Sequence, residues 1–175
     1  QVPSSRVNSG GLNFHGSSKL TEDLTLEGGL SYSKVYSPNY PRYGYGPKNH
    51  MYTVLVWMSD DVDGEALKNH FWIPGQEGYQ QANYNYAWYN NPYFASSELK
   101  QAHDRNVISG QVKLRWDILP NLSIQGRGAV RMKDLFENMQ SPKSYMNYGD
   151  SREGDYKTWN SEQTNFDTDV LLTYT

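Results

Sequence analysis

The residues of this chain best suited to binding chemistry are aromatic rings and amides, which gather in two stretches. Residues 79–94 alternate aromatic side chains with asparagines, and residues 37–49 interleave tyrosine with proline and glycine. Ring faces stack on the apolar faces of sugars, flanking amides bind hydroxyls, and the same residue types dominate protein interfaces. We therefore predict contacts with a bound ligand or with a partner protein, the alternative being rings that only pack the loop against itself. The candidates are Tyr84, Tyr86, Trp88, Tyr89, Asn90, Asn91, Tyr43 and Tyr45.

Other residue types that do chemistry are present, but they form no recognised catalytic or metal-binding set. The four histidines are scattered, and neither H-E-x-x-H nor G-x-S-x-G occurs. An acidic stretch at 59–70 matches a calcium loop only in part, since Ser59 stands in place of the first Asp and His70 in place of the bidentate Glu. We therefore predict that the chain is not an enzyme and holds no metal or cofactor.

The elements that must position the aromatic stretches are indicated by polar and apolar residues that alternate for about ten residues, five times. Between Val107 and Ile118, for example, the odd-numbered side chains from Ser109 to Asp117 are polar and most of the even-numbered ones are apolar. A period of two excludes an amphipathic helix and predicts an all-β, antiparallel chain. The predicted strands are about 10–20, 24–36, 106–118, 122–134 and 163–175.

The length of these strands favours a transmembrane β-barrel over a soluble sheet. Soluble strands average about five to six residues, whereas a membrane-crossing strand needs about nine to eleven. Trp116 and Tyr174 close the apolar faces of two predicted strands, as in the aromatic girdles of membrane barrels. Charges of both signs on the polar faces, such as Arg127 and Asp169, are expected to pair across strands. Alternatively, the basic residues of the fourth strand form a track for anionic cargo.

The connections between the predicted strands are of two lengths. Thr21-Glu22-Asp23 and Leu119-Pro120-Asn121 are tight turns, whereas residues 37–105 and 135–162 are long loops. Tight periplasmic turns and long extracellular loops are the layout of outer-membrane barrels. The apolar run 51–58 is expected to be a short helix buried in the first loop, or a strand of a loop hairpin.

Composition agrees with this interpretation. The formal net charge is −3 with dispersed basic residues, which does not indicate a nucleic-acid partner. Cysteine is absent, which excludes a disulfide-stapled fold. Because five strands cannot close a barrel, we expect the chain to be a piece of a larger one.

Several short motifs occur in an order that resembles the barrel region of SusC/RagA-type TonB-dependent transporters. They are Asn91-Pro92-Tyr93-Phe94, then Asp104-Arg105-Asn106, then Gly110-x-Val112-x-Leu114, and finally Pro120-Asn121-Leu122-Ser123-Ile124-Gln125-Gly126-Arg127. In that family an Asn-Pro-aromatic segment closes a long surface loop and an Asp-Arg pair opens the next strand. The family's plug and TonB box have no counterpart in this sequence.

The resemblance implies that residues 1–175 are part of a TonB-dependent receptor barrel of about 22 strands with a plugged lumen. It further implies residence in the cell outer membrane and active import of a large nutrient, an oligosaccharide or an oligopeptide, with the oligosaccharide favoured. The implied partners are a SusD-like surface lipoprotein and TonB, which would act through a part absent here. The alternatives are a passive porin or structural barrel, and a soluble carbohydrate-binding β-sandwich.

Overall fold

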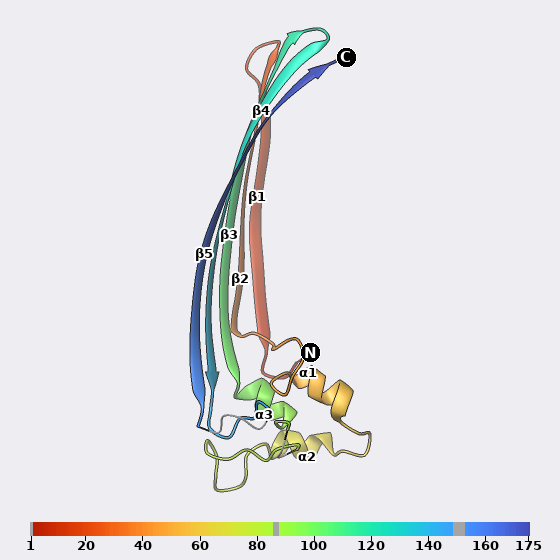
Figure 1. The fold of residues 1–175 in the computed structure, drawn as a ribbon, viewed down its shortest axis with the longest axis vertical. Coiled ribbons are helices and arrows are strands. Elements are labelled where there is room, and N and C mark those ends of the chain that lie inside the picture. Colours follow the sequence, from red (N-terminus) through yellow and green to blue (C-terminus); the bar gives the residue numbers. More distant parts are fainter. Residues whose placement is uncertain (1, 86–87, 149–152) are drawn as a thin grey trace. The chain divides into compact units, whose positions relative to one another are not determined.

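A computed structural model describes residues 2–85, 88–148 and 153–175, and its main element is one five-stranded sheet. The strands are β1 (Arg6–Lys19), β2 (Leu24–Asn39), β3 (Lys100–Leu119), β4 (Leu122–Ser141) and β5 (Asp155–Tyr174). They lie side by side in sequence order as an open antiparallel meander with β1 and β5 at the edges (Figure 1). The prediction of five antiparallel strands is therefore confirmed, and the sheet itself is not closed into a barrel.

The strands are longer than the alternation predicts. β3 begins at Lys100, not near residue 106, and β4 continues to Ser141, not to about 134. The additional residues do not continue the alternation: Lys100 to Arg105 are mostly polar, and Leu135 and Phe136 are adjacent apolar residues. They carry no period-two signal, yet they belong to the strands like the rest. The amide of Tyr40, for instance, donates to the carbonyl of Gln101 at 2.6 Å. The connections between strands accordingly shrink to residues 40–99 and 142–154.

The two tight turns are confirmed and lie at the same end of the sheet. The Leu20 amide donates to the Leu24 carbonyl at 2.8 Å, which closes the β1–β2 turn. The Asp117 amide of β3 donates to the Asp23 carbonyl of that turn at 2.8 Å. Thr175 donates to the Asn121 carbonyl in the β3–β4 turn at 3.0 Å. These bonds place both turns and the last described residue along one end.

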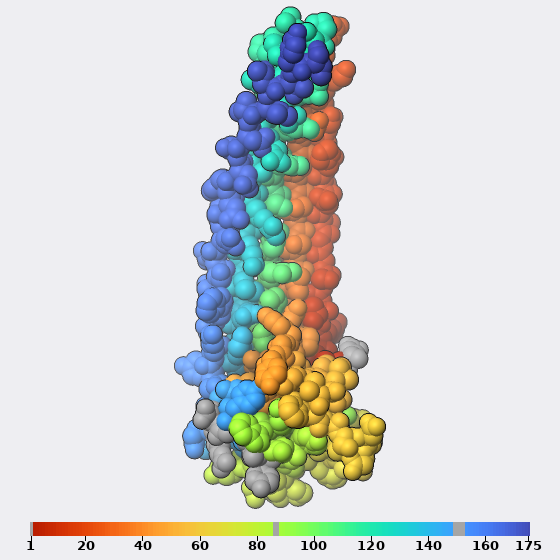
Figure 2. Space-filling model, turned by 45° about the vertical axis from the view of Figure 1, so that its right-hand side comes forward, coloured from red at the N-terminus to blue at the C-terminus, as the bar shows by residue number. Residues whose placement is uncertain are grey.

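The chain divides into two compact units, which we call the sheet unit and the loop unit. The sheet unit comprises 9–35, 105–135 and 160–175; the loop unit comprises 1–8, 36–104 and 136–159. Along the sheet unit all five strands are visible on the face in view in Figure 2. Its apolar side chains are uncovered, with Val170 at 74% and Leu172 at 63% exposure. No described element of this unit packs against them as a second layer.

The opposite face of the sheet unit carries charges that pair across strands. Lys113 on β3 forms an ion pair with Glu27 on β2. Arg127 on β4 reaches Asp169 on β5, with Nη2 2.6 Å from the carboxylate oxygen. The predicted cross-strand pairing is confirmed for these two pairs, both of which are partly exposed.

The loop unit has a small hydrophobic core of its own. Its helices are α1 (His50–Tyr52), the π-helical turn η1 (Thr53–Trp57), α2 (Gly64–Asn69) and α3 (Pro92–Ser97). Phe94 and Ala95 of α3 pack with Leu99 and with Tyr145 from the second connection. Trp72 meets Phe94 edge to face, with ring centroids 5.1 Å apart. The two long connections therefore fold together.

The apolar run 51–58 forms α1 and η1, so the helical alternative is correct. The expectation that it is buried is wrong for most of the run. Thr53 is fully buried, but Leu55 and Val56 are exposed. A π-helical turn widens the helix, and such turns are frequent at functional sites.

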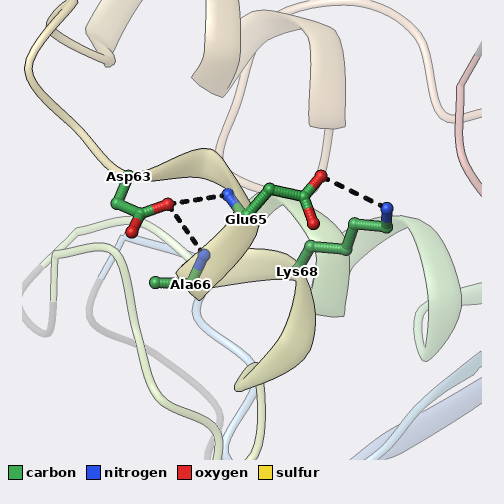
Figure 3. Close-up of polar contacts among 4 residues, drawn as sticks. All are labelled: Asp63, Glu65, Ala66 and Lys68. Atoms are coloured by element: carbon green, nitrogen blue, oxygen red, sulfur yellow. Dashed lines mark hydrogen bonds and ion pairs between the residues drawn. The ribbon is translucent and has the colours of Figure 1, made fainter.

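The acidic stretch that partly matches a calcium loop serves as a helix cap. Asp63 Oδ1 accepts the amides of Glu65 and Ala66 at 3.0 Å each, and Glu65 pairs with Lys68 at 3.4 Å (Figure 3). This N-cap satisfies amides that have no partner inside the helix. In the described part of the chain no three metal-binding side chains cluster. None of the described helices has the length and apolarity needed to span a membrane.

Candidate aromatic binding site

The loop unit contains a pocket of about 440 Å³ whose lining is almost entirely aromatic. Its volume lies in the range of about 300–1,000 Å³ that small-molecule sites occupy. The first long connection supplies six of the lining residues and the second supplies one. They are Tyr45, Trp57, Tyr84, Asn85, Trp88, Tyr89 and Tyr148.

Backbone and side-chain hydrogen bonds fix one side of the pocket. Asn85 and Tyr89 exchange backbone hydrogen bonds of 3.3 and 2.9 Å, and the Trp88 amide donates to Asn85 Oδ1 at 3.2 Å. The Tyr84 hydroxyl donates to the Trp57 carbonyl at 2.8 Å, which ties this segment to the end of η1. Trp57 and Tyr89 pack with centroids 5.2 Å apart. Tyr89 is buried and supports the more exposed rings.

Tyr148 enters the pocket from the second long connection in an unusual backbone conformation. Its φ of 55° lies in the left-handed region, which costs a bulky residue about 1–3 kcal/mol. Its ring stacks with Tyr45 at 6.4 Å and meets Trp88 nearly edge-on at 6.3 Å. Strain of this kind clusters at functional sites, and here it places a ring beside two others.

Tyr45 forms the most exposed wall and is positioned by its neighbours in sequence. Gly44 and Gly46, on either side, have φ values of 84° and 130°, which residues with a Cβ rarely adopt. Hydrogen bonding to Tyr52, and then repulsion from its phenolate, raise the pKa of Tyr45 to about 12. Burial, followed by the nearby Tyr52 hydroxyl, raises the pKa of Tyr89. The ring centroid of Tyr52 lies 4.6 Å from that of Tyr45 and 6.4 Å from that of Tyr89.

The chemistry available in the pocket is that of ring faces and edges. No charged side chain is among its described lining residues. Such a surface binds by stacking and by contact with apolar atoms.

Comparisons with known proteins add no assignment. No family model, curated protein or solved structure matches this chain. The interpretation of the pocket therefore depends on its own geometry.

Four of the eight residues predicted as contacts lie in the pocket, namely Tyr45, Tyr84, Trp88 and Tyr89. Tyr43 is exposed but does not line it. Tyr86 lies outside the described residues. The four residues that the structure brings together come from both aromatic stretches, which were singled out for their composition alone.

Asn90 and Asn91 have a different place from the one predicted, because both have 0% exposure. Asn90 Nδ2 donates to the carbonyls of Pro47 and Met146, and its Oδ1 accepts from the Met146 amide and from Gln81. Asn91 caps α3 and donates to the Leu67 carbonyl at 2.9 Å. A buried amide with these bonds cannot meet a ligand at the surface, so both residues are structural.

Three pocket residues are not among the predicted contacts: Trp57, Asn85 and Tyr148. Asn85 belongs to the stretch 79–94 that the sequence singles out. Trp57 was grouped with an apolar run that was expected to be buried. Tyr148 belongs to the second long connection, which the alternation predicts to be an extracellular loop like the first. The run Tyr145-Met146-Asn147-Tyr148 was a usable signal, since two loops at one end of a sheet can share a surface.

Proposed function

We propose that this chain is part of the wall and extracellular loops of an outer-membrane, TonB-dependent importer of a large nutrient. The observation that supports this proposal most directly is the uncovered apolar face of the sheet unit. Phe14 on β1, Val112 on β3 and Val170 on β5 are each more than half exposed. An aqueous sheet buries such a face under a second layer, whereas a barrel strand turns it to lipid.

Strand length supports the same proposal. β3, β4 and β5 have 20 residues each, and β2 has 16. About nine to eleven residues suffice to cross the hydrocarbon core. The remainder extends the wall beyond the membrane, where residues such as Gln101 and His103 are polar.

The opposite face supports a water-filled or plugged interior. The pairs Lys113–Glu27 and Arg127–Asp169 both lie on it. In a barrel of about 22 strands this face would line the lumen. The charge pairing favours a structural role for these residues over a continuous basic track for anionic cargo.

The partners and the energy source rest on the resemblance to SusC/RagA-type transporters. A SusD-like lipoprotein would cover the extracellular loops, and TonB would act through a segment outside this sequence. Within the resemblance, the Asn91-Pro92 segment would close the long loop. Asn91 caps α3, which ends three residues before β3 begins. A passive porin is the alternative that shares the same wall.

The soluble β-sandwich receives less support. A sandwich covers the apolar face of one sheet with a second sheet about 10 Å away. The described residues form a single sheet.

Arginine substitution on the two faces tests the membrane proposal. Val112→Arg or Ile124→Arg should destabilise the protein in a bilayer by roughly 2–4 kcal/mol near the midplane. The control variants are Gln111→Arg and Gln125→Arg, at neighbouring positions on the other face. They should reduce the stability of the protein in the bilayer far less. The measurement is a folding titration in lipid vesicles. Equal tolerance on both faces, or a native protein that stays in the aqueous phase without detergent, would contradict the proposal.

A further inference from the structure

We propose that the aromatic pocket of the loop unit binds a planar aromatic ring in preference to a polyhydroxylated sugar. The ring could belong to a peptide side chain or to a free aromatic compound. As a statement about cargo or partner, this inference rests on the proposed import function. As a property of the pocket, it can be tested separately.

The arrangement of the rings suits another ring. Tyr45 and Tyr148 stack at an interplanar angle of 25°, whereas Trp88 meets Tyr148 at 65°. Offset-stacked and edge-to-face geometries with centroids about 4.5–7 Å apart are those that aromatic pairs prefer. The exposed rings Tyr45, Trp88 and Tyr148 come from three separate places in the chain. A planar guest can therefore contact faces and edges simultaneously.

Some of the polar atoms that a sugar would need are already in use. The Tyr84 hydroxyl donates to the Trp57 carbonyl, and Asn85 Oδ1 accepts the Trp88 amide. The nearby amide of Asn90 is fully buried. A sugar that entered would lose water from its hydroxyls and could not recover those hydrogen bonds from these engaged groups, which is unfavourable. An aromatic ring carries no such requirement.

Cations also bind to ring faces, but the pocket is poorly matched to them. An aromatic cage surrounds a cation with rings within about 6 Å of one point. This pocket, at about 440 Å³, is larger than a methylammonium group needs. No carboxylate is among its described lining residues, so the described lining offers no anionic partner for a positive charge.

Saturation-transfer NMR on the protein purified in detergent tests the proposal. The probes are N-acetyl-phenylalaninamide, the peptide Gly-Phe-Gly, maltotriose and choline. We expect transfer to the ring protons of the first two and none to maltotriose or choline. If only the free amide gives a signal, the source is a small aromatic compound. If the peptide binds as well or better, the source is an aromatic side chain.

Two ring-removing variants locate the binding site. Trp88→Ala should weaken binding about tenfold, the loss expected for one stacking partner. Tyr148→Gly should do the same, and glycine accepts the positive φ, so the backbone is kept. Tyr43→Ala, an exposed tyrosine outside the pocket, is the matched control and should leave binding unchanged.

Tighter binding of maltotriose or choline than of the aromatic probes overturns the proposal. Absence of any signal from the aromatic probes also overturns it, as does binding that survives both Trp88→Ala and Tyr148→Gly. None of these results bears on the arginine test of the two sheet faces. Failure of the pocket can thus be told apart from failure of the membrane proposal.

Discussion

The sheet unit and the loop unit use the same residue types in opposite ways. In the sheet unit the apolar side chains form one face of the sheet that no described layer covers, and Val170 and Leu172 are mostly exposed. In the loop unit Phe94 and Leu99 are buried at 0% and 1% exposure. The loop unit has an interior stabilised by packing and buried amides. The sheet unit has backbone pairing and two faces that differ in polarity.

This difference indicates where each unit obtains its stability. The loop unit should respond to any change that unpairs a buried polar group, because water cannot replace the lost partner. The sheet unit should tolerate small changes on either face, because little packs against its side chains. Its apolar face depends on the surrounding medium, which is lipid in the proposed function.

The largest expected effect within the loop unit comes from Asn90→Ala. Four hydrogen bonds join this amide to Gln81, Pro47 and Met146, and truncation leaves buried partners unsatisfied. We expect a loss of about 3–4 kcal/mol in the stability of the loop unit. Native-state hydrogen exchange at the Met146 amide measures it. The control is Asn69→Ala, an exposed asparagine, which should change stability by less than about 0.5 kcal/mol. Equal effects of the two variants would remove the contrast.

A pair of glycines extends the comparison to both units. Gly154 of the loop unit has φ 88°, and a Cβ there would lie 2.9 Å from the Ser141 carbonyl oxygen. Gly154→Ala should therefore destabilise by about 2–3 kcal/mol. Gly126 in the sheet unit has nothing within 4 Å of the same position, so Gly126→Ala should lie within about 0.5 kcal/mol of the parent. Denaturant unfolding of both variants provides the measurement, and a larger loss for Gly126→Ala would reverse the argument.

The sheet could be predicted from sequence because its signal is local. The alternation between Val107 and Ile118 predicts both the strand and which residues lie on each of its two faces. The ends of the strands could not be predicted, because Lys100 to Arg105 and Phe136 to Ser141 lack alternation. Their pairing is imposed by neighbouring strands, as in the bond from the Tyr40 amide to Gln101.

The candidate site was only partly predictable for a related reason. Composition singled out the stretch 79–94, yet it could not separate Trp88, which is exposed, from Asn90, which is buried. That separation is made by Pro47 and Met146, which come from distant parts of the chain. Contacts of this kind leave no periodic trace in the sequence.

A cross-strand ion pair sharpens the comparison from the side of the sheet unit. Arg127 and Asp169 are each nearly half exposed, so water screens their attraction. A double-mutant cycle with Arg127→Gln and Asp169→Asn should give a coupling energy of about 0.5–1 kcal/mol. The measurement is denaturant unfolding at low and high salt, with the coupling smaller at high salt. A coupling as large as the loss from Asn90→Ala would mean that the sheet unit also has a dry interior.

The smallest effect we expect is a pH dependence confined to the loop unit. His50 is 8% exposed, and its Nδ1 lies 2.8 Å from the Pro92 carbonyl, so the neutral ring donates to it. Burial lowers the pKa of His50, although the hydrogen bond to Pro92 partly opposes this. The unfolded chain therefore binds the proton more readily than the folded one. Stability is present above the unfolded pKa of about 6.5 and falls as the pH drops through and below it.

Hydrogen exchange of loop-unit amides, measured above and below pH ~6.5, follows this loss. His50→Gln cannot acquire the charge, so the difference between parent and variant isolates the contribution of this histidine from that of other titrating groups. The sheet-unit amides serve as an internal reference, since the hydrogen bond and the ring contact described for His50 are with Pro92 and Tyr93 of the loop unit. An unchanged pH dependence in His50→Gln would mean that desolvation of this ring does not contribute to the loop unit's stability. A loss shared by the sheet unit would mean that the two units do not unfold separately, and the comparison itself would fail.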